Sequence, residues 1–93
     1  MGVAVITRSI AAENLFTDPV KLTGFFNISL SGTWSATVTV QRSFDQGNTW
    51  FDVESFTVNT EQYGLEPEFG VYYRVGVKTG NFTSGTVVTR LSR

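Results

Sequence analysis

The 93-residue chain contains no cysteine, no histidine and few charged residues. The absence of cysteine excludes a disulfide framework and thiolate-ligated metal centres. The absence of histidine excludes a Ser-His-Asp triad and imidazole-ligated metals. Charged residues make up 16% of the chain and the formal net charge is −1, so the sequence lacks the basic surface of a general nucleic-acid binder. It predicts no metal, no cofactor and no nucleic-acid partner.

Secretory and membrane segments are also missing from the sequence. The first residues show no basic region followed by an apolar stretch and a small-residue cleavage site. No apolar run approaches the roughly 20 residues that a membrane helix needs. The sequence therefore predicts synthesis in a cytoplasm without a signal peptide, and no membrane partner.

Apolar and polar residues alternate with a period of two along most of the chain after Leu22, which is typical of half-buried strands. The expected strands cover residues 25–31, 34–43, 49–56, 57–63, 71–78 and 86–91. The expected turns contain glycine and cover residues 31–33, 45–48, 64–70 and 80–85. This pattern predicts an all-β fold, an antiparallel β-sandwich of about six to eight strands.

Residues 1–21 lack the alternation, so they are interpreted as an N-terminal arm or a first strand that precedes a sandwich domain of residues 22–93. An apolar terminal segment must be covered, either by its own sheet or by strand addition to a neighbouring molecule. Its candidate interface residues are Val3, Val5, Ile6, Ile10, Leu15 and Phe16.

Two segments are similar to fibronectin type III domains of the immunoglobulin-like class. Residues 38–43, a turn and Trp50-Phe51-Asp52-Val53 resemble the central hairpin of that family. Leu65-Glu66-Pro67 followed by residues 71–77 resembles its Leu-x-Pro turn and penultimate strand. The resemblance covers residues 22–92 and implies an immunoglobulin-like sandwich, although the usual proline-rich first strand is missing.

Residues 43–50 read Ser-Phe-Asp-Gln-Gly-Asn-Thr-Trp and resemble the Asp box, Ser-x-Asp-x-Gly-x-Thr-Trp, of sialidases and related propellers. In those families the box is structural and repeats once per blade, so a single box does not imply a propeller. The residues expected to build a tight hairpin here are Ser43, Asp45, Gly47, Thr49 and Trp50. Asp45 would accept loop N–H groups, Gly47 would supply a positive φ and Trp50 would pack under the loop.

The aromatic content, 8 Phe, 3 Tyr and 2 Trp, exceeds what one face of a small sandwich can hold. Strand alternation places Phe25 and Tyr72 on the face opposite the core, and one of the neighbours Trp50 and Phe51 should also point outward. Such side chains either pack beneath loops or form an exposed patch, which is typical of an interface. A flat aromatic surface that binds sugars is a further interpretation.

Charge is unevenly distributed along the chain. Residues 44–70 hold six acids and no base, whereas residues 70–93 hold four bases and no acid. Two interpretations stay open: cross-strand pairs within the monomer, or complementary faces that meet between subunits. Asp52 and Glu54 share one strand face about 6.5–7 Å apart. A small sandwich offers no cleft between them, so the sequence predicts no enzyme.

Taken whole, the chain resembles small all-β accessory proteins of tailed-bacteriophage virions, including capsid decoration or cement proteins. The features that carry this resemblance are the short leaderless chain, the Ser31-Gly32-Thr33-Trp34 segment before a Thr-Val strand, and the box hairpin. The resemblance implies a non-enzymatic, homo-oligomeric virion protein that stabilises the phage head by binding other virion proteins, above all the major capsid protein. The alternatives are a carbohydrate- or receptor-binding module and a small head–tail or tail component.

Overall fold

The computed structural model describes residues 4–93, which are built from antiparallel strands without a helix. The strands are β1 (Val5–Ile10), β2 (Leu15–Phe16), β3 (Val20–Ala36), β4 (Val38–Ser43), β5 (Phe51–Phe56), β6 (Thr60–Val77) and β7 (Phe82–Ser92). The predicted all-β, antiparallel, sandwich-like fold of six to eight strands is confirmed. Within these residues no helix is long and apolar enough to cross a membrane.

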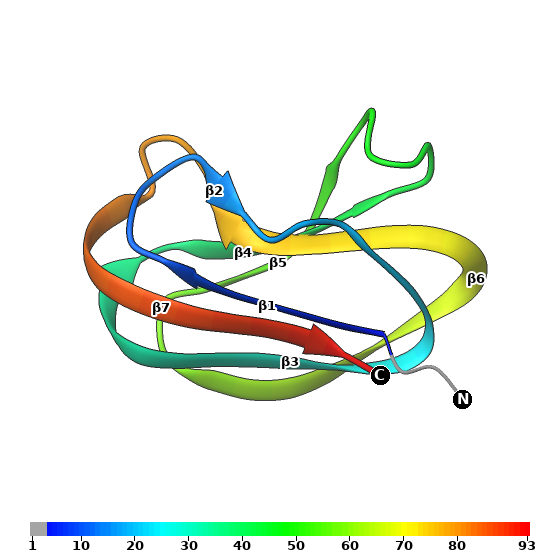
Figure 1. Cartoon of the computed structure of the whole chain (residues 1–93), viewed down its shortest axis with the longest axis horizontal. Helices are drawn as coiled ribbons and strands as arrows, with labels where there is room; N and C mark the ends of the chain where they lie inside the picture. The colour runs from blue at the N-terminus through cyan, green and yellow to red at the C-terminus, as the bar shows by residue number, and fades with distance from the viewer. Residues whose placement is uncertain (1–3) are drawn as a thin grey trace.

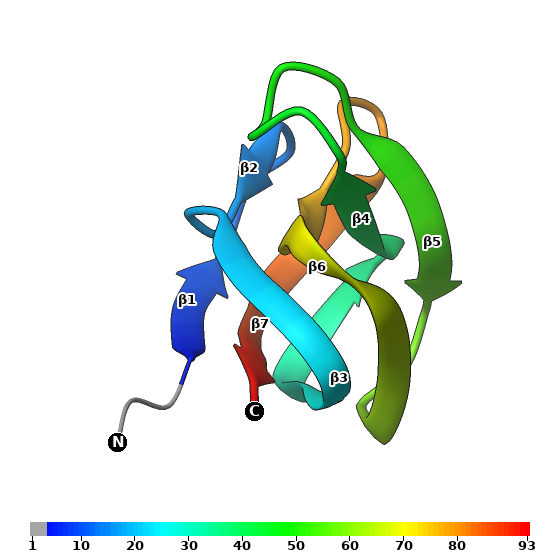
Figure 2. The ribbon, with the colours of Figure 1, turned by 90° about the vertical axis from the view of Figure 1, so that its right-hand side faces the viewer.

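The strands form one curled sheet in the order β1-β7-β3-β6-β4-β5, and β2 pairs with the end of β6. The two long strands connect its halves. β3 pairs with β6 through residues 20–30 and with β7 through residues 27–36. β6 then continues to pair with β4 through residues 72–76. The sheet therefore folds over on itself (Figure 1), and its edge strands β1 and β5 lie on opposite sides in Figure 2.

The core lies inside this curl and is made of side chains that alternate along the strands. Its fully or almost fully buried apolar members are Ile10, Leu22, Phe26, Ile28, Leu30, Val38, Val40, Val71, Tyr73, Val75, Val77, Val87 and Leu91. Every strand except the two-residue β2 and the edge strand β5 contributes to this set. The period-two pattern thus identified inward-facing residues of β3, β4 and β6, namely Phe26, Ile28, Leu30, Val38, Val40, Val71, Tyr73, Val75 and Val77.

Two of the expected glycine turns are wrong as chain reversals, because β3 runs through Gly32 and β6 runs through residues 64–70. The turn expected at 80–85 exists but lies earlier, at residues 78–81, and β7 begins at Phe82 and runs through Gly85. Several of these glycines adopt positive φ, including Gly32 at 104° and Gly85 at 87°. Such a residue bends a strand without ending its pairing, because the neighbouring residues keep their ladder hydrogen bonds.

A large bulge lies in the middle of β6. Leu22 pairs with Val71 and Gly24 pairs with Glu66, so residues 67–70 oppose Thr23 alone. Pro67 has no N–H to donate, and a bulge is one of the few places where a strand accepts proline. The segment that resembles a Leu-x-Pro turn is therefore a bulged strand.

The described part of residues 1–21 belongs to the chain's own sheet. β1 pairs with β7 along its whole length, from Val5 opposite Ser92 to Ile10 opposite Val87. The C-terminus lies beside the start of β1, where the Arg93 N–H donates to the Ala4 carbonyl at 2.9 Å. Of the two interpretations of this segment, a first strand is the one observed.

Candidate functional site

The β4–β5 hairpin is closed by hydrogen bonds among the box residues. The Ser43 hydroxyl donates to Asp45 Oδ1 at 2.7 Å and accepts the Gly47 N–H at 2.8 Å. Asp45 Oδ1 also accepts the Thr49 N–H at 2.8 Å. The hydrogen bond from the Ser43 hydroxyl, and to a lesser extent the one from the Thr49 N–H, lowers the pKa of the Asp45 carboxyl below its usual value. Gly47 has φ 96°, the left-handed conformation that the loop requires.

Trp50 and Phe16 enclose the guanidinium of Arg74. The guanidinium carbon lies 4.3 Å from the Trp50 ring centroid and 4.0 Å from the Phe16 ring centroid. A cation between two aromatic faces stabilises both contacts, more so when it is partly withdrawn from water. Arg74 therefore fastens the box hairpin to β2, and Trp50 and Phe16 have structural roles here.

A polar chain continues from this stack across β4 and β5. Arg74 Nε donates to Gln41 Oε1 at 2.8 Å, and Gln41 Nε2 donates to Asp52 Oδ1 at 2.8 Å. Lys78 Nζ lies 2.7 Å from Asp52 Oδ2. The bond from Lys78, and after it the bond from Gln41, lowers the pKa of Asp52. The Lys78–Asp52 pair links the basic and acidic segments within one chain.

Asp52 and Glu54 do not converge on a shared point. Asp52 is bonded to Lys78 and Gln41, whereas Glu54 accepts the Gln62 amide at 3.1 and 3.2 Å. Within residues 4–93 no three acidic side chains gather in a way that could hold a metal ion.

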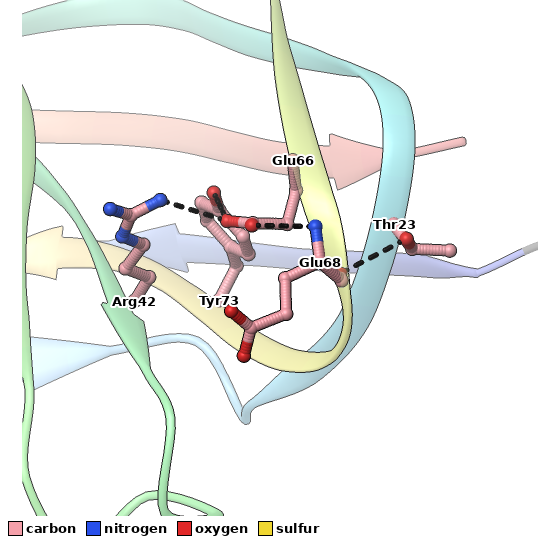
Figure 3. A network of polar contacts seen from close by, with 5 residues as sticks. All are labelled: Thr23, Arg42, Glu66, Glu68 and Tyr73. Carbon is pink, nitrogen blue, oxygen red and sulfur yellow. Dashed lines mark hydrogen bonds and ion pairs between the residues drawn. The ribbon is translucent and has the colours of Figure 1, made fainter.

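Glu66 is an acid in the interior, 2% exposed, on β6 (Figure 3). Its Oε1 accepts the Tyr73 hydroxyl at 2.7 Å and Arg42 Nη1 at 2.9 Å, and its Oε2 accepts the Glu68 N–H at 3.1 Å. The Thr23 hydroxyl donates to the Glu68 carbonyl at 3.1 Å. The carboxylate therefore holds the bulge of β6 through Glu68 and links it to β4 through Arg42.

The environment of Glu66 shifts two pKa values in opposite directions. Burial alone raises the pKa of Glu66, but the bonds from Tyr73, Glu68 N–H and Arg42 outweigh it and lower the pKa below the usual value. Burial, and after it the bond to the Glu66 carboxylate, raises the pKa of Tyr73 to about 12. At neutral pH the pair is therefore an anion and a neutral phenol.

This arrangement predicts loss of stability at high pH. The neutral Tyr73 phenol is favoured in the folded state, so its contribution is complete below the unfolded pKa of about 10 and is lost as pH rises toward 12. As the pH is raised, phenolate absorbance should show one tyrosine that ionises at higher pH than the others. Circular dichroism should show unfolding at that same pH. In Tyr73→Phe that late ionisation should be absent. A wild-type chain whose tyrosines all ionise while it stays folded below pH 11 would contradict the assignment.

The predicted interface residues do not form one surface. Val3 lies outside the described residues. Ile10 is fully buried in the chain's own core, because its side chain points inward from the end of β1, and it is not available to a partner. The partly buried members are Ile6, Leu15, Phe16 and Tyr72, and the exposed members are Val5 at 44% and Phe25 at 65%. Lys21 Nζ lies over the Tyr72 ring, 5.6 Å from the ring centroid.

Phe25 belongs to an exposed cluster on the outer face of β3 and β6. It lies opposite Leu65 in the ladder, and its ring meets that of Tyr63 edge-on at 5.9 Å. Tyr63 is 67% exposed and Leu65 is 56% exposed. We call Phe25, Tyr63 and Leu65 the outer cluster. Leu65 was missed because residues 64–70 were expected to be a turn. Tyr63 stood at the end of the expected strand 57–63, where it was not assigned to an outward face. Continuing the alternation of Glu61 and Tyr63 through Gly64 would have found Leu65.

A second apolar surface lies on the hairpin side of the molecule. Phe44 and Phe51 have ring centroids 6.1 Å apart, and the Arg42 guanidinium lies 5.0 Å from the Phe44 ring. With Val53 they line an open groove of about 450 Å³. β5, which carries Phe51 and Val53, is an edge strand of the sheet. The groove is therefore next to unpaired backbone.

No protein-family model, curated protein or solved structure matches the chain.

Proposed function

We propose that this chain is a non-enzymatic structural protein of a tailed-bacteriophage virion, which binds the capsid shell through the outer cluster. The observation that supports the proposal is the exposure of Phe25, Tyr63 and Leu65 together on two paired strands. Burying such side chains between proteins is favourable at about 25 cal/mol per Å² of apolar surface. Exposed aromatic residues in the centre of an interface frequently carry most of its binding energy.

The scaffold supports binding rather than chemistry. The acids of β5 are engaged by Lys78, Gln41 and Gln62, and the buried acid Glu66 is engaged by three donors. On the outer face of β3 and β6, the large side chains of Phe25, Tyr63 and Leu65 are more than half exposed. A protein that binds only the assembled shell stabilises that shell by mass action. The edge strand β5, with Phe51 and Val53 exposed, is the surface on which we propose that copies of this chain associate.

The capsid proposal predicts a large effect of two substitutions. Phe25→Ser/Tyr63→Ser should weaken co-sedimentation with purified phage heads that lack this protein by roughly 1,000-fold, because truncating each of two central aromatic residues costs about 2 kcal/mol or more. Val58→Ser is the matched control, since Val58 is 68% exposed but lies outside the outer cluster. Circular dichroism should show both variants folded.

Two outcomes would reject this proposal. One is head binding by the double variant equal to that of the wild type. The other is gold-labelled protein found on tails and never on heads. Sedimentation velocity of the free wild-type chain tests the accompanying proposal of a homo-oligomer, which a single monomeric species at high concentration would refute.

A further inference from the structure

Three connections between strands meet at one end of the sandwich, β3 to β4, β5 to β6 and β6 to β7, at the left of Figure 1. Between them lies a hollow of about 370 Å³ whose lining includes Trp34, Thr57 and Asn81. A second hollow of about 280 Å³ shares Trp34 and Thr57 with the first. An extended ligand could therefore pass from one hollow to the other along the same indole.

The indole of Trp34 is held in one orientation. Its Nε1–H donates to Asn59 Oδ1 at 2.7 Å, and Asn59 Nδ2 donates to the Gly32 carbonyl at 3.1 Å. Trp34 is partly buried against the core. In residues 4–93 no aromatic ring or cation stacks on it, whereas Trp50 is stacked on Arg74. Trp34 is therefore a fixed aromatic surface whose polar edge is already satisfied.

The remaining lining is polar and uncharged. Five of the eight residues around the larger hollow carry a hydroxyl or amide group, and neither hollow is lined by a charged side chain. Within the described residues, the side chains of Thr37, Asn81 and Thr83 form no hydrogen bond with the protein. Hydroxyl and amide groups both donate and accept, so they suit a ligand that is rich in hydroxyl groups.

We infer that these two neighbouring hollows bind a neutral oligosaccharide, with one sugar ring against Trp34. A sugar ring offers an apolar C–H face to an aromatic side chain and a rim of hydroxyl groups to polar ones. That combination matches a site with one aromatic surface and a few convergent polar groups. An apolar peptide would leave the threonine and asparagine groups unpaired, and an ionic ligand would find no opposite charge.

The test uses the intact chain and short, uncharged oligomers of glucose, galactose, mannose and N-acetylglucosamine at millimolar concentration. Binding is measured by saturation-transfer NMR and by tryptophan fluorescence. Asn81→Ala/Thr83→Ala should weaken binding of a bound oligomer about tenfold, through loss of two neutral hydrogen-bonding groups. Thr79→Ala/Ser84→Ala is the matched control, because these exposed neighbours do not line either hollow.

Binding that is weakened only by the first pair supports the inference. It is overturned if no oligomer of the set binds, or if the first pair does not weaken binding more than the second. The Trp34 hollows and the outer cluster share no residue, so Phe25→Ser/Tyr63→Ser should bind sugars like the wild type. The sugar-binding inference can therefore be wrong while the capsid proposal stands, and the capsid proposal can be wrong while the sugar-binding inference stands.

Discussion

Replacing Glu66 with alanine is expected to lower the free energy of unfolding by about 2–4 kcal/mol, because it removes a buried carboxylate that accepts three hydrogen bonds. The Tyr73 hydroxyl and the Glu68 N–H would lose their acceptor, and Arg42 would lose its counter-ion. Urea unfolding followed by tryptophan fluorescence measures the change. Glu61→Ala is the control, since exposed Glu61 accepts only the Ser29 hydroxyl among residues 4–93, and its effect should stay within about 1 kcal/mol.

The charge of Glu66 can be separated from its hydrogen bonds by Glu66→Gln, which keeps an acceptor for Tyr73. Because folding lowers the pKa of Glu66, the carboxylate stabilises the fold above its unfolded pKa of about 4.3, and this is lost as pH falls through the folded value. The stability difference between wild type and Glu66→Gln should therefore shrink in acid. An Ala variant within 1 kcal/mol of the wild type, or a Gln difference independent of pH, would contradict this account.

The buried acid also shows what the sequence could not reveal. Glu66 stands between leucine and proline in a segment with a second glutamate, which is typical of a solvated turn. Its partner Arg42 is 24 residues away and on another strand. No local pattern encodes such a pair, because it depends on the register of β4 against β6. The alternation that predicted the strands gives each strand its inward face but does not give its neighbours.

The box hairpin is the opposite case. Its hydrogen bonds join Ser43, Asp45, Gly47 and Thr49 across at most four residues. The residue types that form them can therefore be read directly from a short segment. The stacking of Trp50 on Arg74 could not be predicted from the sequence, since it joins the loop to a strand that is distant along the chain. Of the outer cluster, only Phe25 was predicted to be an exposed interface residue. Recognising Leu65 as a member required knowing that β6 continues through Gly64.

Strand β7 also continues through a glycine, Gly85, which lies very close to the backbone of β3. Gly85 lies in β7 opposite Trp34 with φ 87°. A Cβ on Gly85 would clash with the Thr33 carbonyl oxygen and lie 2.6 Å from the Trp34 Cα, both on β3. Backbone atoms of a paired strand cannot move aside as a flexible side chain can. Gly85→Ala should therefore lower the free energy of unfolding by at least about 4 kcal/mol.

Gly80→Ala separates the two causes, because Gly80 has nearly the same φ, 86°, with nothing within 4 Å of its Cβ position. It should cost only the roughly 1–2 kcal/mol of a left-handed alanine. Thermal unfolding of both variants measures the difference, and a domain with about 5–15 kcal/mol of total stability makes it large. Equal effects at the two glycines would mean that backbone conformation alone is responsible. They would also mean that β3 and β7 separate enough to admit a methyl group, so that the strand carrying Trp34 is not held in place by β7.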